Sequence, residues 1–342
     1  MITPPFLKSG DLVAISSTAR KITLSELQPS IDLFKSWGLS VILAPNLFES
    51  ENQFAGSDKQ RADDLQHFLD DEKVKAIICA RGGYGTVRII DMLDFTRFRA
   101  APKWIVGYSD VTVLHSHINK NFEIETLHSA MPVNYNASNK STKESFDNLQ
   151  RCLFGEIPHY SVKPHNLNRQ GEARGRITGG NLSILYSLIG SNSDIDTTGK
   201  ILFLEDIDEY LYHIDRMMQS LKRSGKLNNL SGLVIGHFTD MRDNEVPFGK
   251  SAEEIIREAV EEFDYPVAFG LPVGHEPVNM PIIEGREVLL QVQDNETNLK
   301  FLESQGLKEY GMLKAILKTS LWIIGGFISL YLIYSLILGR FS

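Results

Sequence analysis

One serine is the residue of this 342-residue chain best placed to do chemistry. The segment Ile105–Asp110 reads IVGYSD, an apolar run that stops at a glycine turn, and it predicts a strand followed by a helix. A parallel strand delivers such a residue to the carboxyl edge of its sheet, where open α/β folds bind ligands. The same turn exposes the nucleophile of serine hydrolases, although Val111 replaces the last glycine of the G-x-S-x-G pattern. We therefore predict that Ser109 is a nucleophile.

A serine hydroxyl attacks poorly unless a base removes its proton and a third group orients that base. Among nine histidines, His275 is the preferred base, because it lies in a Gly- and Pro-rich loop that leaves an apolar strand. His128 ends a short strand-like run and could line the site, and His237 follows another apolar run. The other six are expected to pack in helices or to lie on the surface: His67, His115, His117, His159, His165 and His213.

The orienting acid is expected at the end of another strand. Lys200–Glu205 reads KILFLE, so Glu205 is the first acid after an apolar run. The acids that follow continue into a turn and helix, where carboxylates normally cap the helix or face its dipole: Asp206, Asp208 and Glu209. Glu205 is therefore the predicted partner of the base.

A developing oxyanion also needs hydrogen-bond donors. Backbone N–H groups in the turn Gly82–Gly85 can approach it closely, because glycine has no Cβ, and the N–H of Asp110 directly follows the nucleophile. The alternative is that these glycines form a tight strand-helix turn and nothing more.

Composition excludes several other classes of protein. The net charge of −8 argues against a nucleic-acid-binding protein, which usually carries a basic face. Cys79 and Cys152 are too far apart to suggest a disulfide framework or a metal site, so we expect a reducing compartment. The N-terminus lacks the basic and apolar regions of a secretory signal.

Strand and helix signals alternate along the chain. In the first half, strands are predicted at Asp11–Ser17, Leu39–Ala44, Lys75–Ala80 and Trp104–Val106, with helical patterns between them. This order predicts an α/β fold with a parallel sheet and helices on both faces. We divide the chain into four parts: an N-terminal nucleophile domain (1–135), an interdomain connection (136–170), a smaller C-terminal α/β domain carrying Glu and His (171–306), and a tail helix (319–338).

The tail differs from the rest of the chain. Thr319–Leu338 contains no charge, and at ~1.5 Å per residue it would span the ~30 Å hydrocarbon core of a bilayer. We predict a transmembrane helix there, with a buried or dimer-forming helix as the alternative. Lysines precede the segment at 308, 314 and 318, so the body is expected on the cytoplasmic face of the inner membrane, held by a single-pass tail anchor.

Five short motifs occur in the order found in the LD-carboxypeptidase family, which includes the microcin C immunity peptidases. They are RGGYG at Arg81–Gly85, GYSD at Gly107–Asp110, GGNL at Gly179–Leu182, LED at Leu204–Asp206 and GHEPVN at Gly274–Asn279. The chain resembles this family over about residues 3–305. His128–Pro132 departs from the family's more frequent Gly-Pro pair, and the membrane tail is not part of the usual pattern.

The resemblance implies a serine carboxypeptidase with Ser109 as nucleophile, His275 as general base and Glu205 as its partner. It also implies an oxyanion hole formed by the N–H groups of Gly83 and Asp110. The implied fold is a flavodoxin-like or glutamine-amidotransferase-like nucleophile domain followed by a smaller domain. Family members act without a metal or other cofactor, and a homodimer is expected.

The substrate implied by the resemblance is a murein tetrapeptide, cut between an L-configured diamino-acid centre and terminal D-alanine during peptidoglycan recycling. Capture of the free carboxylate needs polar donors, and the candidates are Arg81, Tyr84 and Asn181. One alternative is an immunity-type peptidase that cleaves a peptide-nucleotide, which should need an aromatic platform for the base. Another is a membrane-tethered binding protein without catalytic activity.

Overall fold

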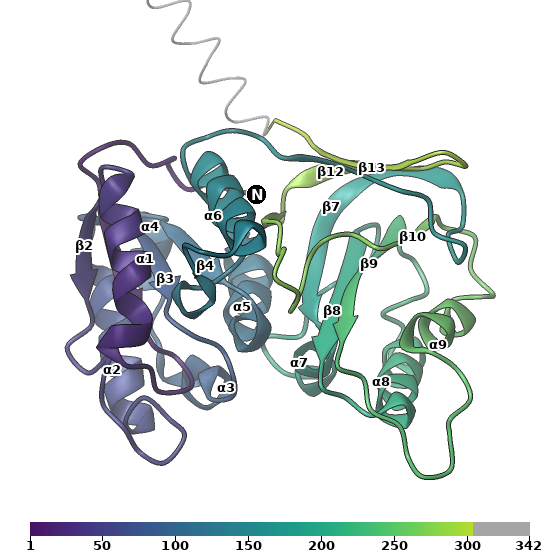
Figure 1. Cartoon of the computed structure of the whole chain (residues 1–342), viewed down its shortest axis with the longest axis horizontal. Coiled ribbons are helices and arrows are strands. Elements are labelled where there is room, and N and C mark those ends of the chain that lie inside the picture. The colour runs from purple at the N-terminus through teal and green to yellow at the C-terminus, as the bar shows by residue number, and fades with distance from the viewer. Residues whose placement is uncertain (304–342) are drawn as a thin grey trace, which may run out of the picture. The chain divides into compact units, whose positions relative to one another are not determined.

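The computed structural model describes residues 1–303 (Figure 1). Five strands of the first half and strand β11 from near the end of this range form a six-stranded sheet. The strand order is β11-β5-β4-β3-β1-β2, and β1 to β5 all run parallel. The order 2-1-3-4-5 is that of flavodoxin-like folds, which bind ligands at the carboxyl ends of the strands. The strands are β1 (Leu12–Ser16), β2 (Ser40–Leu43), β3 (Val74–Cys79), β4 (Trp104–Gly107), β5 (Thr126–His128) and β11 (Ile282–Glu284).

Helices connect these strands and cover the sheet. Capping boxes begin the two longest of them, since Thr23 bonds reciprocally with Glu26 and Ser57 with Gln60. Each helix buries an apolar stripe, and Phe34 and Phe68 are completely enclosed. The helices are α1 (Leu24–Ser36), α2 (Asp58–Asp70), α3 (Thr86–Ile89), α4 (Thr96–Ala100) and α5 (Thr112–Phe122), with short 3₁₀ turns at Ile90–Met92 and Ser109–Val111.

The second half forms a seven-stranded sheet in the order β10-β9-β8-β7-β12-β13-β6. Strands β7 to β10 are parallel, whereas β12, β13 and β6 extend the sheet in antiparallel fashion. The strands are β6 (His159–Val162), β7 (Gly171–Asn181), β8 (Ile201–Ile207), β9 (Gly232–Thr239), β10 (Val267–Phe269), β12 (Glu287–Val292) and β13 (Thr297–Phe301). The helices are α7 (Leu182–Ser187), α8 (Leu211–Arg223) and α9 (Ala252–Ala259).

The interval predicted as an interdomain connection contains regular structure. Helix α6 (Lys140–Leu153) and strand β6 both lie in it, and a 3₁₀ turn at Pro132–Asn134 precedes them. Asn139 caps α6 by accepting hydrogen bonds from the backbone of Ser141 and Thr142. The predicted domain boundaries themselves stay a prediction.

Strand β11 ties the two sheets together. It follows β10 of the second sheet, yet it pairs in antiparallel fashion with β5 of the first, with Ile282 opposite His128. Close to this crossing, Arg286 donates to both carboxylate oxygens of Glu125 at 2.7 and 2.6 Å, and both side chains are buried. A bidentate pair of this kind fixes geometry as well as charge.

Glu284, the last residue of β11, is a buried carboxyl with no ion-pair or side-chain hydrogen-bond partner among residues 1–303. Burial raises its pKa well above the ordinary value. An acid whose folded-state pKa is raised binds more protons folded than unfolded, so stability falls as pH rises past the unfolded pKa. We therefore expect Glu284→Gln to raise the melting temperature by about 2 °C or more at about pH 8, with little change at about pH 4. Calorimetry checks this, with the exposed Glu72→Gln as control. Equal shifts at both pH values would contradict it.

The predicted transmembrane helix requires a correction. Within residues 1–303, no helix is long and apolar enough to cross a membrane. The longest described helix, α6, has 14 residues, about 21 Å at 1.5 Å each, and is short of the ~30 Å hydrocarbon core. Thr319–Leu338, on which the prediction was based, lies outside the described residues. Over residues 1–303 the fold class is the two-domain α/β fold, and neither the transmembrane helix nor the inner-membrane localisation by a tail anchor is supported.

Candidate active site

Ser109 occupies a strained turn at the carboxyl end of β4. Its φ is 62°, in the left-handed region that a serine seldom adopts, and the chain turns there directly into the 3₁₀ segment before α5. The flanking strand is completely buried, whereas Ser109 itself is partly exposed. The geometry is that of a nucleophile elbow, which presents the hydroxyl at the edge of the sheet.

The glycine turn after β3 lies against this hydroxyl. A Cβ placed on Gly82 would lie only 3.3 Å from Ser109 Oγ, so the turn's backbone approaches the serine as closely as a glycine permits. Gly83 has φ of 113°, and a Cβ there would overlap the side chain of Arg20. The backbone N–H groups of this turn therefore lie in the neighbourhood where donors for an oxyanion are needed.

The side chain of Asp110 stabilises the glycine turn. Its buried carboxylate accepts a hydrogen bond from the backbone N–H of Thr86 at 2.8 Å. The buried Arg61 stabilises the same turn by donating a hydrogen bond to the carbonyl oxygen of Gly85 at 3.0 Å. Burial raises the pKa of Asp110, and the N–H groups of Thr86 and Gly85 favour its ionised form. The sequence suggested a role for the Asp110 backbone but not for its side chain.

His275 and Glu205 form a close pair. Glu205 lies in β8 and is completely buried, and its Oε2 lies 2.7 Å from Nδ1 of His275, whose side chain is 11% exposed. Burial disfavours the protonated imidazole, but the charge and hydrogen bond of Glu205, together with Asp206, outweigh it and raise the pKa of His275. Oε1 of Glu205 has no hydrogen-bond partner within residues 1–303. The carboxylate is thus committed to orienting this one ring.

The ring of Tyr108 links the histidine to the serine elbow. Its centroid lies 4.7 Å from that of His275, and its hydroxyl receives a hydrogen bond from Asn134 at 3.2 Å. Tyr108 is the residue immediately before Ser109, so the second half of the chain delivers His275 to the end of β4. Among the described residues no hydrogen bond joins Ser109 to His275. Such bonds are often long in proteins without substrate and tighten in the complex.

Other histidines are less suited to act as a base. His115 is buried with Nε2 2.8 Å from the carbonyl oxygen of Gly107, and burial lowers its pKa to about 4. His128, which could have lined the site, is buried beneath the elbow, and burial likewise lowers its pKa. His237 is half-buried with a lowered pKa, and burial is again the main cause.

The three residues proposed from sequence to bind substrate lie in different surroundings. Arg81 is 31% exposed and pairs with Glu26 at 3.4 Å, and Tyr84 is 46% exposed beside Phe54. Asn181 is buried at the start of α7, where its Nδ2 donates to Asp206 at 2.8 Å and its Oδ1 caps the helix. Both amide atoms of Asn181 are therefore already engaged inside the protein. Burial and the nearby Glu205 raise the pKa of Asp206 to about 7.

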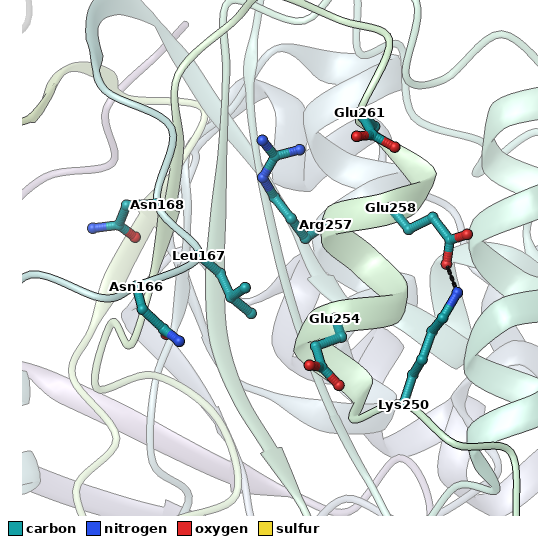
Figure 2. A pocket seen from close by; sticks show the side chains of 8 residues that line it. All are labelled: Asn166, Leu167, Asn168, Lys250, Glu254, Arg257, Glu258 and Glu261. Atoms are coloured by element: carbon teal, nitrogen blue, oxygen red, sulfur yellow. Dashed lines mark hydrogen bonds and ion pairs between the residues drawn. The ribbon is translucent and has the colours of Figure 1, made fainter.

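A surface hollow of about 500 Å³ lies elsewhere. It is lined by α9 and the segment 166–168, and Figure 2 shows Glu254, Glu258 and Arg257 projecting from the helix, with Lys250 paired to Glu258. No serine, cysteine or histidine lines it, so it does not offer the serine and histidine that the predicted chemistry needs. Within residues 1–303 no group of three or more His, Cys, Asp or Glu side chains is arranged to hold a metal ion.

The strained serine, the glycine turn and the histidine–glutamate pair form a candidate hydrolase site on a two-domain α/β fold. Residues 11–129 match the family model of the LD-carboxypeptidase N-terminal domain, and residues 174–290 match that of the LD-carboxypeptidase C-terminal domain. The chain therefore belongs to the LD-carboxypeptidase family and is a hydrolase.

Individual relatives agree with this assignment. A protein of Bacillus subtilis strain 168, named probable murein peptide carboxypeptidase, is 32% identical over 307 residues, which cover 89% of this chain and 96% of the relative. The crystal structure of muramoyltetrapeptide carboxypeptidase from Oxalobacter formigenes superimposes with a TM-score of 0.78 at 25% identity, covering 85% of this chain and 99% of that one. The microcin C7 self-immunity protein in complex with aspartyl sulfamoyl adenosine has a TM-score of 0.77 at 18% identity, over 88% and 98% of the two chains. This last likeness shows the fold alone.

Neither these comparisons nor the structure supports the expected membrane anchoring or homodimer.

Proposed function

We propose that the protein is a serine LD-carboxypeptidase that releases terminal D-alanine from murein tetrapeptide. The observation that carries the proposal is the 2.7 Å pair of Glu205 and His275, which lies beside the strained elbow of Ser109. The family membership and the names of the relatives support the substrate class. The immunity-type activity gains less support, because the likeness to that structure extends to the fold only.

In the proposed mechanism, His275 removes the proton of Ser109 as its oxygen attacks the scissile carbonyl carbon. Glu205 holds the ring by Nδ1 and stabilises the imidazolium that forms. The backbone N–H groups of Gly83 and Asp110 stabilise the oxyanion. His275 then protonates the leaving D-alanine, and water, activated by the same histidine, releases the shortened peptide from Ser109.

Exopeptidase specificity requires capture of a free carboxylate beside the scissile bond. Arg81 is the proposed donor, because its guanidinium is partly exposed and belongs to the glycine turn that lies against Ser109. Tyr84, on the same turn, is exposed and could contribute a hydroxyl. Asn181 is a weaker candidate, because its amide is engaged by Asp206 and by α7.

The full chain should therefore release D-alanine from a tetrapeptide that ends in a free carboxylate. Amidating that carboxylate removes the charge that a guanidinium recognises, and we expect kcat/KM to fall about 100-fold or more. Chromatographic detection of D-alanine and D-alanine amide checks both substrates. Equal cleavage of the two peptides would indicate an endopeptidase or an amidohydrolase instead.

A further inference from the structure

An arginine that the sequence did not single out lies against the glycine turn of the candidate site. Arg20 follows β1, whose carboxyl end meets those of β3 and β4 at one edge of the parallel sheet. A Cβ placed on Gly83 would lie 2.1 Å from Cδ and 2.3 Å from Cγ of Arg20, so the aliphatic part of this side chain covers the glycine. Two neighbouring glycines thus contact two different side chains, since Gly82 lies against Ser109 and Gly83 against Arg20.

The backbone of Arg20 is fixed by two neighbouring segments. Its N–H donates to the carbonyl oxygen of Gly82 at 3.4 Å, and the residue forms an isolated antiparallel bridge with Phe54. The residue is nevertheless exposed to solvent. Because the backbone is already fixed, a ligand of Arg20 would have to order little more than the end of one side chain, which lowers the entropic cost of binding.

Arg20 also carries a charge that the protein does not neutralise. Within residues 1–303 no carboxylate pairs with its guanidinium and no hydrogen bond joins that group to another residue, whereas Arg81 pairs with Glu26 at 3.4 Å. A ligand carboxylate at Arg81 would therefore share that cation with Glu26, and one at Arg20 would not. The planar fork of a guanidinium can donate to both oxygens of one carboxylate.

The spacing of the hydroxyl and the arginine suits the last residue of a peptide. A Cβ on Gly82 would lie 3.3 Å from Ser109 Oγ, and the Cα of Gly83, which contacts Arg20, is ~3.8 Å from that of Gly82. In a peptide, the terminal carboxylate carbon follows the scissile carbonyl carbon by three bonds, which span about 4 Å or less. A serine at one glycine and an arginine at the next are therefore spaced for a single residue that ends in a free carboxylate.

We propose that Arg20 binds the terminal carboxylate of the substrate, and that it contributes more to this recognition than Arg81 because no carboxylate of the protein competes for it. The inference rests on the proposed function and deepens it, since Arg20 becomes the residue that distinguishes a C-terminal residue from an internal one. A peptide that continues beyond the scissile bond, or that ends in an amide, offers no carboxylate to this guanidinium.

The test combines removal of the arginine with removal of the carboxylate that it is proposed to bind. Two murein tetrapeptides, one ending in D-alanine and one in D-alanine amide, are compared as substrates of the full chain. Arg20→Met keeps an apolar stem on Gly83, and we expect its kcat/KM to fall about 10-fold or more for the free acid, mainly through KM, and to stay unchanged for the amide. Equal losses for the two peptides would place the effect of Arg20 on the oxyanion or on the turn, and would overturn the proposal, as would no loss for either.

Further variants separate the roles of the two arginines. Arg81→Met should lower the ratio of free acid to amide by a smaller factor than Arg20→Met, and a larger factor would overturn the proposal. Adding Glu26→Gln to Arg20→Met releases Arg81 from its ion pair, while glutamine can still complete the capping box with Thr23. Part of the lost ratio should then return, which a merely structural role of Arg20 does not explain. No return would contradict the proposed competition by Glu26.

A matched control is available at the other edge of the sheet. Arg97 of α4 is exposed, and within the described residues no carboxylate pairs with it. Because α4 precedes β4, it lies towards the amino end of this strand, whereas Ser109 follows the carboxyl end. Arg97→Met removes the same charge and should leave kcat/KM unchanged for both peptides.

A binding measurement separates this inference from the proposed activity. Calorimetry of both peptides with the full-length Ser109→Ala protein reports recognition without turnover. Binding that prefers the free acid and loses this preference when Arg20→Met is added, without D-alanine release by the wild type, would support the arginine site and refute the proposed function. D-alanine release by the wild type, with the same preference in both proteins, would do the reverse. If Arg20→Met melts at a lower temperature than the wild type, Arg20→Gln decides the question, and an unchanged ratio of free acid to amide would then refute the arginine site.

Discussion

Replacing Ser109 with alanine is expected to abolish peptidase activity and leave the fold intact. The change removes only the attacking oxygen, and in a well-studied serine protease loss of the nucleophile lowers kcat by about a million-fold. Ser109 also has a left-handed φ of 62°, which alanine tolerates no better than serine, so the melting temperature should change little. Release of D-alanine and thermal unfolding, measured on the same preparation, check the two parts.

A matched control lies on the helix that follows. Ser116 of α5 is completely buried, and its Oγ has no hydrogen-bond partner among the described residues. Ser116→Ala therefore removes a serine hydroxyl from the following helix without changing the elbow, and should retain activity. Wild-type turnover by Ser109→Ala would refute the serine mechanism.

Glu205 and His275 are expected to behave as one unit with Ser109. His275→Ala and Glu205→Gln should each lower kcat by about 10⁴-fold or more, and the double variant should be little worse than His275→Ala alone. The exposed His159→Ala on β6 is the control and should retain activity. Losses that multiply independently would contradict the assignment of a triad.

The pH profile distinguishes an orienting role of Glu205 from a purely structural one. His275 must be neutral to accept a proton, so kcat/KM of the wild type should rise as pH passes the raised pKa of this histidine. Burial lowers the pKa of His275, but the charge and the hydrogen bond of Glu205 raise it and outweigh the effect of burial. The acidic limb of Glu205→Gln should therefore move to lower pH. A limb that stays in place would argue against direct coupling of the two groups.

Much of the first sheet could be predicted from the sequence, because its strands are short apolar runs separated by helical spacing. The predictions at Lys75–Ala80 and Trp104–Val106 fall on β3 and β4 with small shifts at their ends. Strand β11 was missed for a physical reason. Its three residues pair with a strand more than 150 positions earlier in the chain, and no local pattern carries that information. Helix α6 did leave a signal, since Phe146, Leu149 and Leu153 have helical spacing after a capping asparagine.

Part of the candidate site could likewise be predicted from the sequence, and part of it could not. Ser109 follows the end of an apolar strand, Glu205 lies near the end of another, and His275 lies in a loop that follows a third; the order of their motifs adds to that signal. The role of Asp110 in holding the glycine turn and the contact between the rings of Tyr108 and His275 depend on which side chains meet across the fold. For Asn181, the sequence suggested a role that its contacts in the structure do not favour. Its residue type suits substrate binding, yet its partners are the end of β8 and its own helix.

The path of the chain through β11 bears on when the protein becomes active during synthesis. The loop that carries His275 leaves β10 in one sheet and is secured at its far end by β11 in the other. The serine elbow is made early, but its proposed base is placed only after residues 282–284 have left the ribosome and joined β5. A nascent or truncated chain that ends before this point would hold the nucleophile without a positioned base. On the proposed mechanism, hydrolysis would begin only after nearly all of the described chain has been made.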